Sequence, residues 1–381
     1  MASLQCEDAR HADLPQKQKS ELVLNYWPAG DHDRGASTSG INCLIVLLKR
    51  IYAALLDPPM LNSKRSQIED LKKMMEADNP FMAHAWLVFG PSSDGVGAAL
   101  IRLTDGVWGK ELKEIAHKDL HFENLVAHAR MNTTLWSMPR FNLMLEHLWW
   151  QQDTRQWRQL QHETTPTEVK DYFAKWNPTP TPGSLCLGAF PGMSLDVEVN
   201  KLFGEFSVGN FTVLVRPDAP VFFYATFTVK DVGEEKLDFN AFRRFTLETG
   251  QLINVDGVMR WQRTGRAGQM PYNLMAIVKY RDTADGSDSI RIYDDFGSNS
   301  IPIGKLPDYA SPDWKMADMK NGDTFLAMFV YSRMPPKTRP PFPEVFMKRN
   351  LDGYLANYQV FSSLINGGQE EKRDRDAGNR Q

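Results

Sequence analysis

Histidine and cysteine, on which most thiol and metal chemistry depends, are scarce in this chain of 381 residues. There are eight histidines, and none of them lies beyond His162. The three cysteines, Cys6, Cys43 and Cys186, are odd in number and far apart. This argues against a disulfide framework and against a zinc site built from two close cysteine pairs. We therefore expect free thiols, no bound metal, and a reducing compartment, the cytoplasm or the nucleus.

A strong charge imbalance and a long apolar run are missing too. The chain carries 44 basic and 47 acidic residues, a net charge of −3, which argues against nucleic acid as a partner. No apolar run reaches the ~20 residues that a membrane span requires, and the N-terminus has no apolar signal region. Neither a glycine-rich phosphate loop nor a Gly-x-Ser-x-Gly elbow occurs, so the sequence predicts no cofactor and no serine hydrolase.

Changes in composition predict four regions. Residues 1–38 are polar and rich in small residues, which is typical of a flexible tail. Residues 39–176 read as a helical lobe, and the proline-rich segment that follows cannot continue a helix. Residues 177–333 read as a sheet-rich lobe, and 334–381 as a proline-rich segment, a short helix and a charged tail. The helical signals of the first lobe fall at residues 43–56, 64–77, 110–130 and 141–161.

The second lobe contains short runs of β-branched and aromatic residues separated by Gly and Asp turns. Helices followed by antiparallel strands indicate the α+β class, with a cleft expected between the lobes. This is the layout of papain-like thiol hydrolases, although many unrelated proteins share it. The predicted strands are Phe211–Val215, Val221–Val229, Leu274–Tyr280, Ser289–Tyr293 and Thr324–Tyr331.

Cys43 opens an apolar run that continues to Leu48. A cysteine at a helix N-terminus has a lowered thiol pKa and is the usual place for a thiolate nucleophile. The alternative is that Cys43 is one more small, buried apolar residue. The rest of the sequence has to decide between these two interpretations.

Two segments of the first lobe resemble motifs of the ubiquitin-specific proteases, a family of thiol-dependent deubiquitinases. Ser39-Gly40-Ile41-Asn42-Cys43 is similar to the Gly-Asn-Thr-Cys box, in which the cysteine is the nucleophile and a nearby asparagine helps to bind the oxyanion. In this chain Asn42 stands directly before the cysteine. The segment from Gln151 to Trp157 resembles the family's Gln-Gln-Asp-Ala-x-Glu-Phe motif, which assigns substrate contacts to Gln152 and Asp153.

Two further resemblances lie in the second lobe. Tyr272–Val278 is similar to the family's Tyr-x-Leu-x-Ala-Val-Val strand, and Arg291–Asp295 to a strand that ends in Phe-Asp-Asp. On this comparison Asp294 takes the position of the triad acid. Phe325–Tyr331 looks like the closing strand, so the order of motifs fits over roughly residues 40–333.

The general base of that family is missing. It comes from a Gly-His-Tyr strand between the two strands just described, whereas this chain has only residues 279–288 there, with no histidine. A thiol needs a base or a cationic neighbour to ionise near neutral pH, and a carboxylate such as Asp294 would raise its pKa instead. His147 or His162 could act as a displaced base from the first lobe. The zinc-binding cysteine pairs found in many members are absent as well.

The resemblance implies a protein that binds ubiquitin or a ubiquitin-like protein, with weak or lost isopeptidase activity. The basic tail of ubiquitin would then lie between the lobes, with an arginine against Asp153. The scissile carbonyl would sit over Cys43, held by the Cys43 amide and Asn42. Cys43, Asp153 and Asp294 should converge at one cleft if this interpretation holds.

Three alternatives stay open. Asn42-Cys43-Leu44 also resembles the Asp-Gly-Asn-Cys-Leu box of ovarian-tumour-type deubiquitinases, although that family's aspartate and terminal histidine are missing. The ten tryptophans are compatible with a non-enzymatic interaction protein unrelated to ubiquitin, because Trp anchors interfaces. His117, His121 and His128 fall at helical spacings that could place metal ligands on one face, but partly exposed helix residues are the favoured interpretation.

Overall fold

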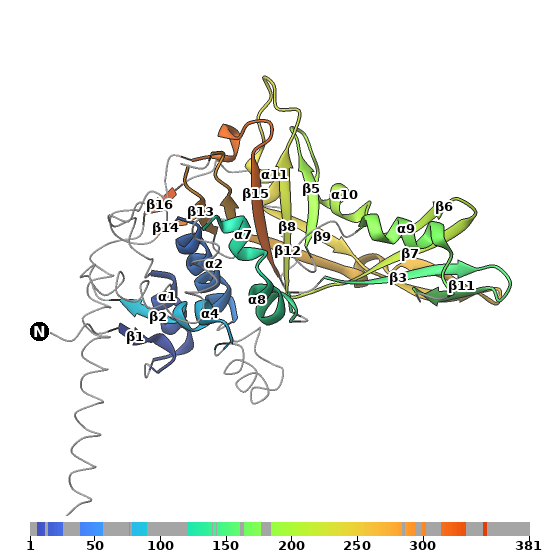
Figure 1. Ribbon diagram of the computed structural model, residues 1–381, viewed down its shortest axis with the longest axis horizontal. Helices are drawn as coiled ribbons and strands as arrows, with labels where there is room; N and C mark the ends of the chain where they lie inside the picture. Colours follow the sequence, from blue (N-terminus) through green and yellow to red (C-terminus); the bar gives the residue numbers. More distant parts are fainter. Residues whose placement is uncertain are drawn as a thin grey trace, which may run out of the picture.

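A computed structural model describes residues 6–11, 14–25, 39–55, 76, 78–89, 120–138, 140–141, 143–160, 164–176, 184–283, 286–293, 299–301, 314–332 and 346–348. Helices and strands are mixed along these residues, as Figure 1 shows. The mixed class predicted from the sequence is therefore confirmed.

A central sheet of eight strands occupies the middle of the molecule (Figure 1). Its strands are β5 (Leu185–Ala189), β8 (Phe222–Val229), β9 (Arg244–Glu248), β12 (Gln269–Lys279), β13 (Ser289–Tyr293), β14 (Asn299–Ile301), β15 (Thr324–Tyr331) and β16 (Phe346–Lys348). They lie in the order β16-β14-β13-β12-β15-β8-β5, and β9 also pairs with β12. Neighbouring strands are antiparallel except for β5 with β8 and β14 with β16.

Smaller sheets lie on either side of the central one. A four-stranded antiparallel sheet has the order β4-β3-β7-β6 and extends to the right in Figure 1. Its strands are β3 (Met144–Gln151), β4 (Gln156–Gln159), β6 (Gly204–Val208) and β7 (Phe211–Asp218). A hairpin of β10 (Gly250–Val255) and β11 (Val258–Arg263) contacts β4, and β1 (Cys6–Asp8) pairs with β2 (Leu87–Phe89) at the opposite end.

The helices are α1 (Gln16–Asn25), α2 (Ser39–Leu55), α4 (Pro80–His84), α7 (Phe122–Val126), α8 (Ala129–Met131), α9 (Thr167–Trp176), α10 (Leu195–Asn200) and α11 (Phe239–Phe242). Single turns occur at η1 (Ala9–His11), η3 (Asn132–Trp136, a π-helical turn), η4 (Gly265–Gly268) and η6 (Met316–Asp318). None of the described helices is long and apolar enough to cross a membrane.

Helix α2 is the central helix of the molecule. All of its residues from Ser39 to Ala54 are buried, and the helix contacts α1, α4, α7, β12 and β13. A helix that is apolar on nearly every side has to be surrounded by protein. The apolar run that begins at Cys43 therefore places this helix in the core.

Two hydrophobic cores lie on the two faces of the central sheet, because side chains alternate along each strand. On β8, Phe222 and Tyr224 join the core around α2, whereas Phe223 and Phe227 join the core on the other face. Strand β15 alternates in the same way. Each fully buried side chain of this size contributes about 1.5–3 kcal/mol to folding, so the sheet is fixed from both sides.

The five strands predicted in the second lobe are confirmed as β7, β8, β12, β13 and β15. The predicted helix at residues 43–56 is confirmed as α2. The stretch at 110–130 is helical in α7 and at the start of α8, and residues 110–119 lie outside the described residues. The stretch at 64–77 lies almost entirely outside them.

The predicted helix at residues 141–161 is wrong. Strands β3 and β4 form a hairpin there, and Arg155 supplies a left-handed turn residue with a φ of 51°. Trp149 is buried and packs against Phe211 at 6.3 Å, while Trp150 packs against its cross-strand partner Trp157 at 5.4 Å. The tryptophans therefore alternate between the two faces of a sheet, as side chains on a strand do, and do not follow the helical spacing that we expected.

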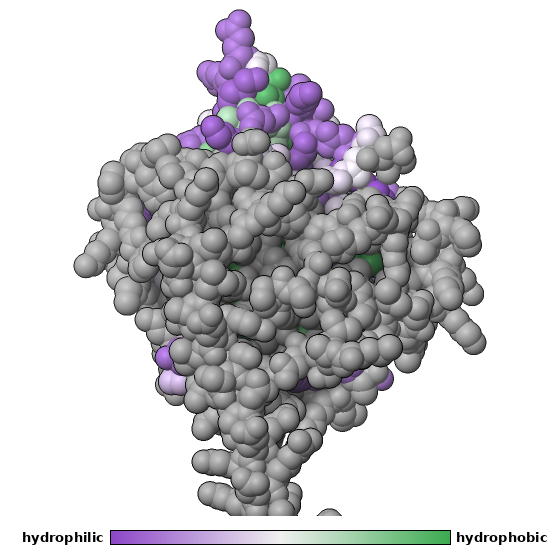
Figure 2. All heavy atoms as spheres, turned by 90° about the vertical axis from the view of Figure 1, so that its left-hand side faces the viewer, coloured by the Kyte–Doolittle hydropathy of each residue, from purple (hydrophilic) through white to green (hydrophobic). Residues whose placement is uncertain are grey.

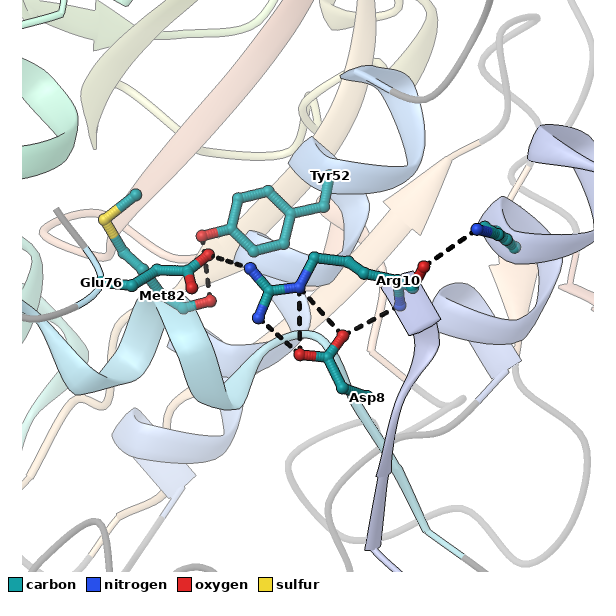
Figure 3. A network of polar contacts seen from close by, with 6 residues as sticks. Asp8, Arg10, Tyr52, Glu76 and Met82 are labelled. Atoms are coloured by element: carbon teal, nitrogen blue, oxygen red, sulfur yellow. Dashed lines mark hydrogen bonds and ion pairs between the residues drawn. The ribbon is translucent and has the colours of Figure 1, made fainter. Parts of the chain in front are cut away.

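The prediction of a flexible tail for residues 1–38 is wrong for 6–11 and 14–25, which form β1, η1 and α1. Figure 3 shows the polar contacts that hold this segment. The guanidinium of Arg10 donates to Asp8 at 2.5 Å and to Glu76 at 2.5 Å, and it lies 5.4 Å from the centre of the Trp86 ring. Trp86 in turn stacks on Tyr52 of α2 at 4.3 Å. One arginine and two aromatic rings therefore add to the packing of α1 on α2 in attaching this segment to the central helix.

Figure 2 shows hydrophilic side chains gathered at the top of the molecule. The turn that follows β8 rises at this end in Figure 1 and exposes acidic and basic residues together. Its backbone is fixed by Asn321, whose side chain accepts from the Val232 amide at 2.7 Å and donates to the Val232 carbonyl at 3.2 Å. The exposed residues of this turn are Lys230, Asp231, Glu234, Glu235 and Lys236.

Candidate functional site

Cys43 lies one turn inside α2, which begins at Ser39. Its side chain is 0% exposed and belongs to the core between α2 and the sheet. The amides without an acceptor in a helix are those of its first four residues, and Cys43 comes after them. The expected position at the mouth of the helix is therefore not observed, and its amide is poorly placed to hold an oxyanion.

The surroundings of Cys43 favour the protonated thiol. Burial raises the pKa of the Cys43 thiol well above its ordinary value, and the carboxylate of Asp288 raises it further. Both effects disfavour the thiolate, because a charge in an apolar environment and a second negative charge nearby are each costly. Cys43 in this conformation is a buried thiol whose surroundings favour the protonated form.

Asp288 is a site residue that the sequence analysis did not identify. It stands directly before β13, is 1% exposed, and links three parts of the chain. Its carboxylate accepts from the Phe122 amide at 3.0 Å and from the Arg281 amide at 3.2 Å. Its own amide donates to Oγ of Ser39 at 3.1 Å. The start of α2, the start of α7 and the β12–β13 connection therefore meet at Asp288.

Two opposing effects act on the Asp288 carboxyl. Burial raises its pKa above the ordinary value, and the hydrogen bonds from the two amides, with the charges of Arg281 and His121, lower it in part. The side chain of Arg281 donates to Nδ1 of His121, which stands at the N-cap position of α7. No sequence pattern predicts this cluster, because its members come from distant positions and meet only in the fold.

The β12–β13 connection stands where the resemblance places the strand that carries the catalytic histidine. The two strands pair directly, from Ala276 with Ile292 to Lys279 with Ser289. The loop between them is too short for another strand, as the sequence analysis predicted. Where the resemblance places a histidine after the Tyr-x-Leu-x-Ala strand, this chain has Asp288 at the start of the next strand. The charge of this carboxylate acts on the Cys43 thiol and raises its pKa.

The proposed displaced bases do not reach Cys43 in the described part of the chain. His147 lies on β3, and its ring packs on Phe173 of α9 at 4.4 Å. Burial lowers the pKa of His147, which keeps the ring neutral at neutral pH. Strand β3 belongs to the four-stranded sheet and has no place beside α2 (Figure 1). His162 lies outside the described residues.

The remaining residues named from the sequence are only partly brought together. Asn42 is buried beside Cys43 in α2. Gln152 and Asp153 are exposed in the β3–β4 turn, in the sheet that extends away from α2 (Figure 1). Asp294 lies outside the described residues, although α2 does reach the end of β13, where Nε of Arg50 donates to the Tyr293 carbonyl at 2.9 Å. Cys43 and Asp153 therefore do not share a site.

The histidines at helical spacing do not share one helix face. His121 stands at the N-cap position of α7 without a side-chain cap, and His128 caps α8 by accepting from the Arg130 amide at 3.2 Å. His117 lies outside the described residues. Within the described ranges, no three side chains of His, Cys, Asp or Glu are grouped so that they could hold a metal ion.

No model of a known protein family matches this chain, and no curated protein matches it significantly. Comparison with solved structures gives distant likenesses. The structural neighbours include ubiquitin hydrolases. One is the SAGA Ubp8/Sgf11/Sus1/Sgf73 DUB module bound to ubiquitin aldehyde, at 10% identity and a TM-score of 0.43, with 83% of this chain and 71% of that chain covered.

The Saccharomyces cerevisiae PAN2 pseudoubiquitin-hydrolase-RNase module is a second neighbour, at 12% identity and a TM-score of 0.33. The match covers 82% of this chain and 55% of that chain. The PAN2 pseudoubiquitin-hydrolase alone matches with 13% identity, a TM-score of 0.28, and coverage of 82% and 88%. At such low identity and TM-scores these are divergent likenesses, which leave function to the residues themselves.

Proposed function

We propose that this chain is a divergent ubiquitin-hydrolase-like protein that binds ubiquitin or a ubiquitin-like protein and has lost thiol hydrolysis. One observation carries the proposal. Helix α2, which contains the Cys43 segment, packs on β12 and β13, and β15 pairs with β12. Strands β12 and β13 contain two of the other segments that resemble the family. Segments far apart in the sequence therefore pack together in the fold, which supports the proposal.

The loss of hydrolysis is supported by the surroundings of Cys43. Attack by a thiol requires a thiolate and a base with a pKa near the operating pH. Asp288 is the ionisable neighbour that raises the pKa of Cys43, and a carboxyl group accepts a proton from such a thiol only uphill. Its oxygens already accept from two backbone amides. We therefore expect a pseudoenzyme.

Contact with the partner is proposed for exposed parts of the molecule. Gln152 and Asp153 lie in an exposed turn, which suits contact with a folded surface rather than with a tail over Cys43. A reducing compartment, the cytoplasm or the nucleus, is proposed because Cys43 and Cys186 are free thiols. The net charge of −3 favours a protein partner over nucleic acid.

The test uses ubiquitin with a thiol-reactive group at its C-terminus, incubated with the full chain and analysed by intact mass. We expect no adduct at Cys43. The variant Cys43→Ala and the variant Cys186→Ser, which removes an exposed thiol, are run in parallel. An adduct that persists in Cys186→Ser and disappears in Cys43→Ala would show a reactive thiolate and contradict the proposed loss of activity.

Ubiquitin binding is measured separately, with unmodified ubiquitin. We expect saturable binding that Cys43→Ala leaves unchanged and that Asp153→Ala weakens. Absence of binding would contradict the ubiquitin part of the proposal.

A second candidate function is a protein-interaction domain unrelated to ubiquitin. The observation that favours it is a pair of exposed apolar side chains next to the turn of the β10–β11 hairpin, where Val255 is 39% and Met259 is 37% exposed. Leu160, just after β4, is 40% exposed as well. Exposed apolar groups of this kind mark contact surfaces when they cluster. The test is the substitution of Val255 and Met259 by Ser, which should leave ubiquitin binding unchanged if this pair serves a different partner.

A further inference from the structure

The backbone of a short segment, Leu120–Phe122, lies against the first turn of α2, so close that there is no room for a side chain at Gly40. A Cβ atom on Gly40 would lie 2.1 Å from the Leu120 carbonyl oxygen, 2.6 Å from the Phe122 nitrogen and 2.9 Å from the His121 carbonyl carbon. All three are backbone atoms, which cannot rotate away as a side chain would. Only glycine at position 40 therefore permits this contact.

Asp288 holds this segment in place. Its carboxylate accepts from the Phe122 amide at 3.0 Å, and its amide donates to Ser39 at 3.1 Å. The side chain of Arg281 adds a hydrogen bond to His121. Residues 120–122 are therefore tied to the start of α2 and to the β12–β13 connection at once.

The segment is apolar where it meets the core. Phe122 is 0% exposed and lies 5.8 Å from Tyr280, ring centre to ring centre. Cys43 lies one turn further along α2 and is 0% exposed too. The start of the helix, over which the resemblance places the substrate tail, is thus occupied by the chain itself.

We propose that residues 120–122 are an internal plug over the Cys43 end of α2, and that Asp288 is the residue that keeps the plug closed. Release of Asp288 then exposes Cys43 while the rest of the fold stays intact. The proposal rests on the proposed function in one respect, namely that the plug occupies the place of a bound peptide tail. It explains how a cysteine in a family-like position becomes inaccessible.

The test measures how fast Cys43 reacts with a thiol reagent under native conditions. The parent is Cys6→Ser/Cys186→Ser, in which Cys43 is the single remaining thiol of the three. Asp288→Ala removes both acceptor oxygens, and Asp288→Asn removes the charge but keeps one. The second variant measures how much of any acceleration comes from a lowered thiol pKa.

Gly40→Ala provides an independent perturbation, because it leaves Asp288 in place. Alanine has a higher helix propensity than glycine by about 1 kcal/mol, so α2 alone would gain stability. The backbone contact at 2.1 Å predicts the opposite for the plug, which an added methyl group would displace. Slower labelling of Cys43 would therefore indicate the gain in helix stability, and faster labelling would indicate displacement of the plug.

Global destabilisation is controlled with Leu247→Ala. Leu247 is 0% exposed but lies in the core on the other face of the sheet, away from α2. The unfolding free energy of every variant is measured in urea, and labelling rates are compared at equal stability. We expect Asp288→Ala and Gly40→Ala to label about tenfold to a hundredfold faster than Leu247→Ala, as expected for loss of a hydrogen bond to a charged acceptor.

Equal labelling of Cys43 in Asp288→Ala and Leu247→Ala at equal stability would overturn the proposal, because exposure would then require global unfolding. A Gly40→Ala variant that labels no faster than the parent would overturn it as well. No ubiquitin is present in this experiment. Its failure is therefore distinguishable from a failure of the proposed ubiquitin binding.

Discussion

His84, the last residue of α4, should make the protein unstable in mild acid. It is 4% exposed, and its pKa is lowered to about 3, first by burial and then by the charge of Lys49. Lys49 is itself 0% exposed, and its Nζ donates to the carbonyls of Ala85 at 3.0 Å and Leu87 at 2.7 Å. A proton on His84 would therefore place a second cation beside one that is already buried and fixed.

The size of the effect follows from the difference between the two pKa values of His84. The unfolded value is 6.5 and the folded value about 3, so His84 stabilises the fold fully above pH 6.5 and loses this contribution as the pH falls towards 3. One unit corresponds to about 1.4 kcal/mol, which gives about 2 kcal/mol lost at pH 5 and about 4 kcal/mol lost at pH 3.

The assay is urea unfolding followed by tryptophan fluorescence at pH 7.5 and pH 5.0, for the natural chain and for His84→Gln. Glutamine keeps a polar side chain and does not titrate. Other groups, including Asp288, titrate in both proteins and cancel in the comparison. We expect the natural chain to lose about 2 kcal/mol more than His84→Gln between these two pH values. An equal loss in both proteins would refute the assignment of His84 as a buried neutral histidine.

Three further outcomes are expected. In the folded natural chain a thiol reagent should modify Cys186, which is exposed, within minutes, and should modify Cys43 far more slowly; fast loss of both thiols would contradict the burial of Cys43. Asp288→Ala should lower the unfolding free energy by about 3 kcal/mol or more, since one buried and one partly buried amide lose a charged acceptor, and Asp288→Asn should lower it by less. The pKa of Asp288 is raised on folding, so its contribution is present at acid pH and lost as the pH rises through the folded pKa. The stability deficit of Asp288→Asn relative to the natural chain should therefore shrink as the pH rises from 4, and a constant difference would contradict the raised pKa. Arg10→Ala should cost about 1 kcal/mol, because its ion pairs are partly exposed, and limited proteolysis should then cut the first 25 residues faster than in Arg10→Lys; equal cleavage would show that Arg10 does not hold the segment.

The strands of the central sheet could be predicted because local signals and burial agree. Phe222–Val229 and Thr324–Tyr331 are runs of β-branched and aromatic residues, and both lie inside a sheet with apolar groups on each face. The apolar run after Cys43 predicted α2 for the same reason. Parallel pairing of β5 with β8 could not be predicted, since it depends on how the chain returns between distant strands.

Other features depend on contacts that the sequence does not display. The tryptophan-rich stretch around Trp149 fits either a helix or a strand until β7 is placed beside it. The N-terminal segment looked like a tail because its anchor, Arg10 with Glu76, joins residues far apart in the sequence. Asp288 could not be identified from the sequence, because it looks like any aspartate in a turn. Its contacts with Ser39 and Phe122 form only in the folded chain.

Mass spectrometry of the chain mixed with ubiquitin that carries a thiol-reactive C-terminus distinguishes a protein that holds ubiquitin without reacting with it from an active thiol hydrolase. We expect a one-to-one complex under native conditions that separates completely into its two unmodified masses under denaturing conditions. A covalent adduct that maps to Cys43, or the absence of any complex, would show that this expectation is wrong.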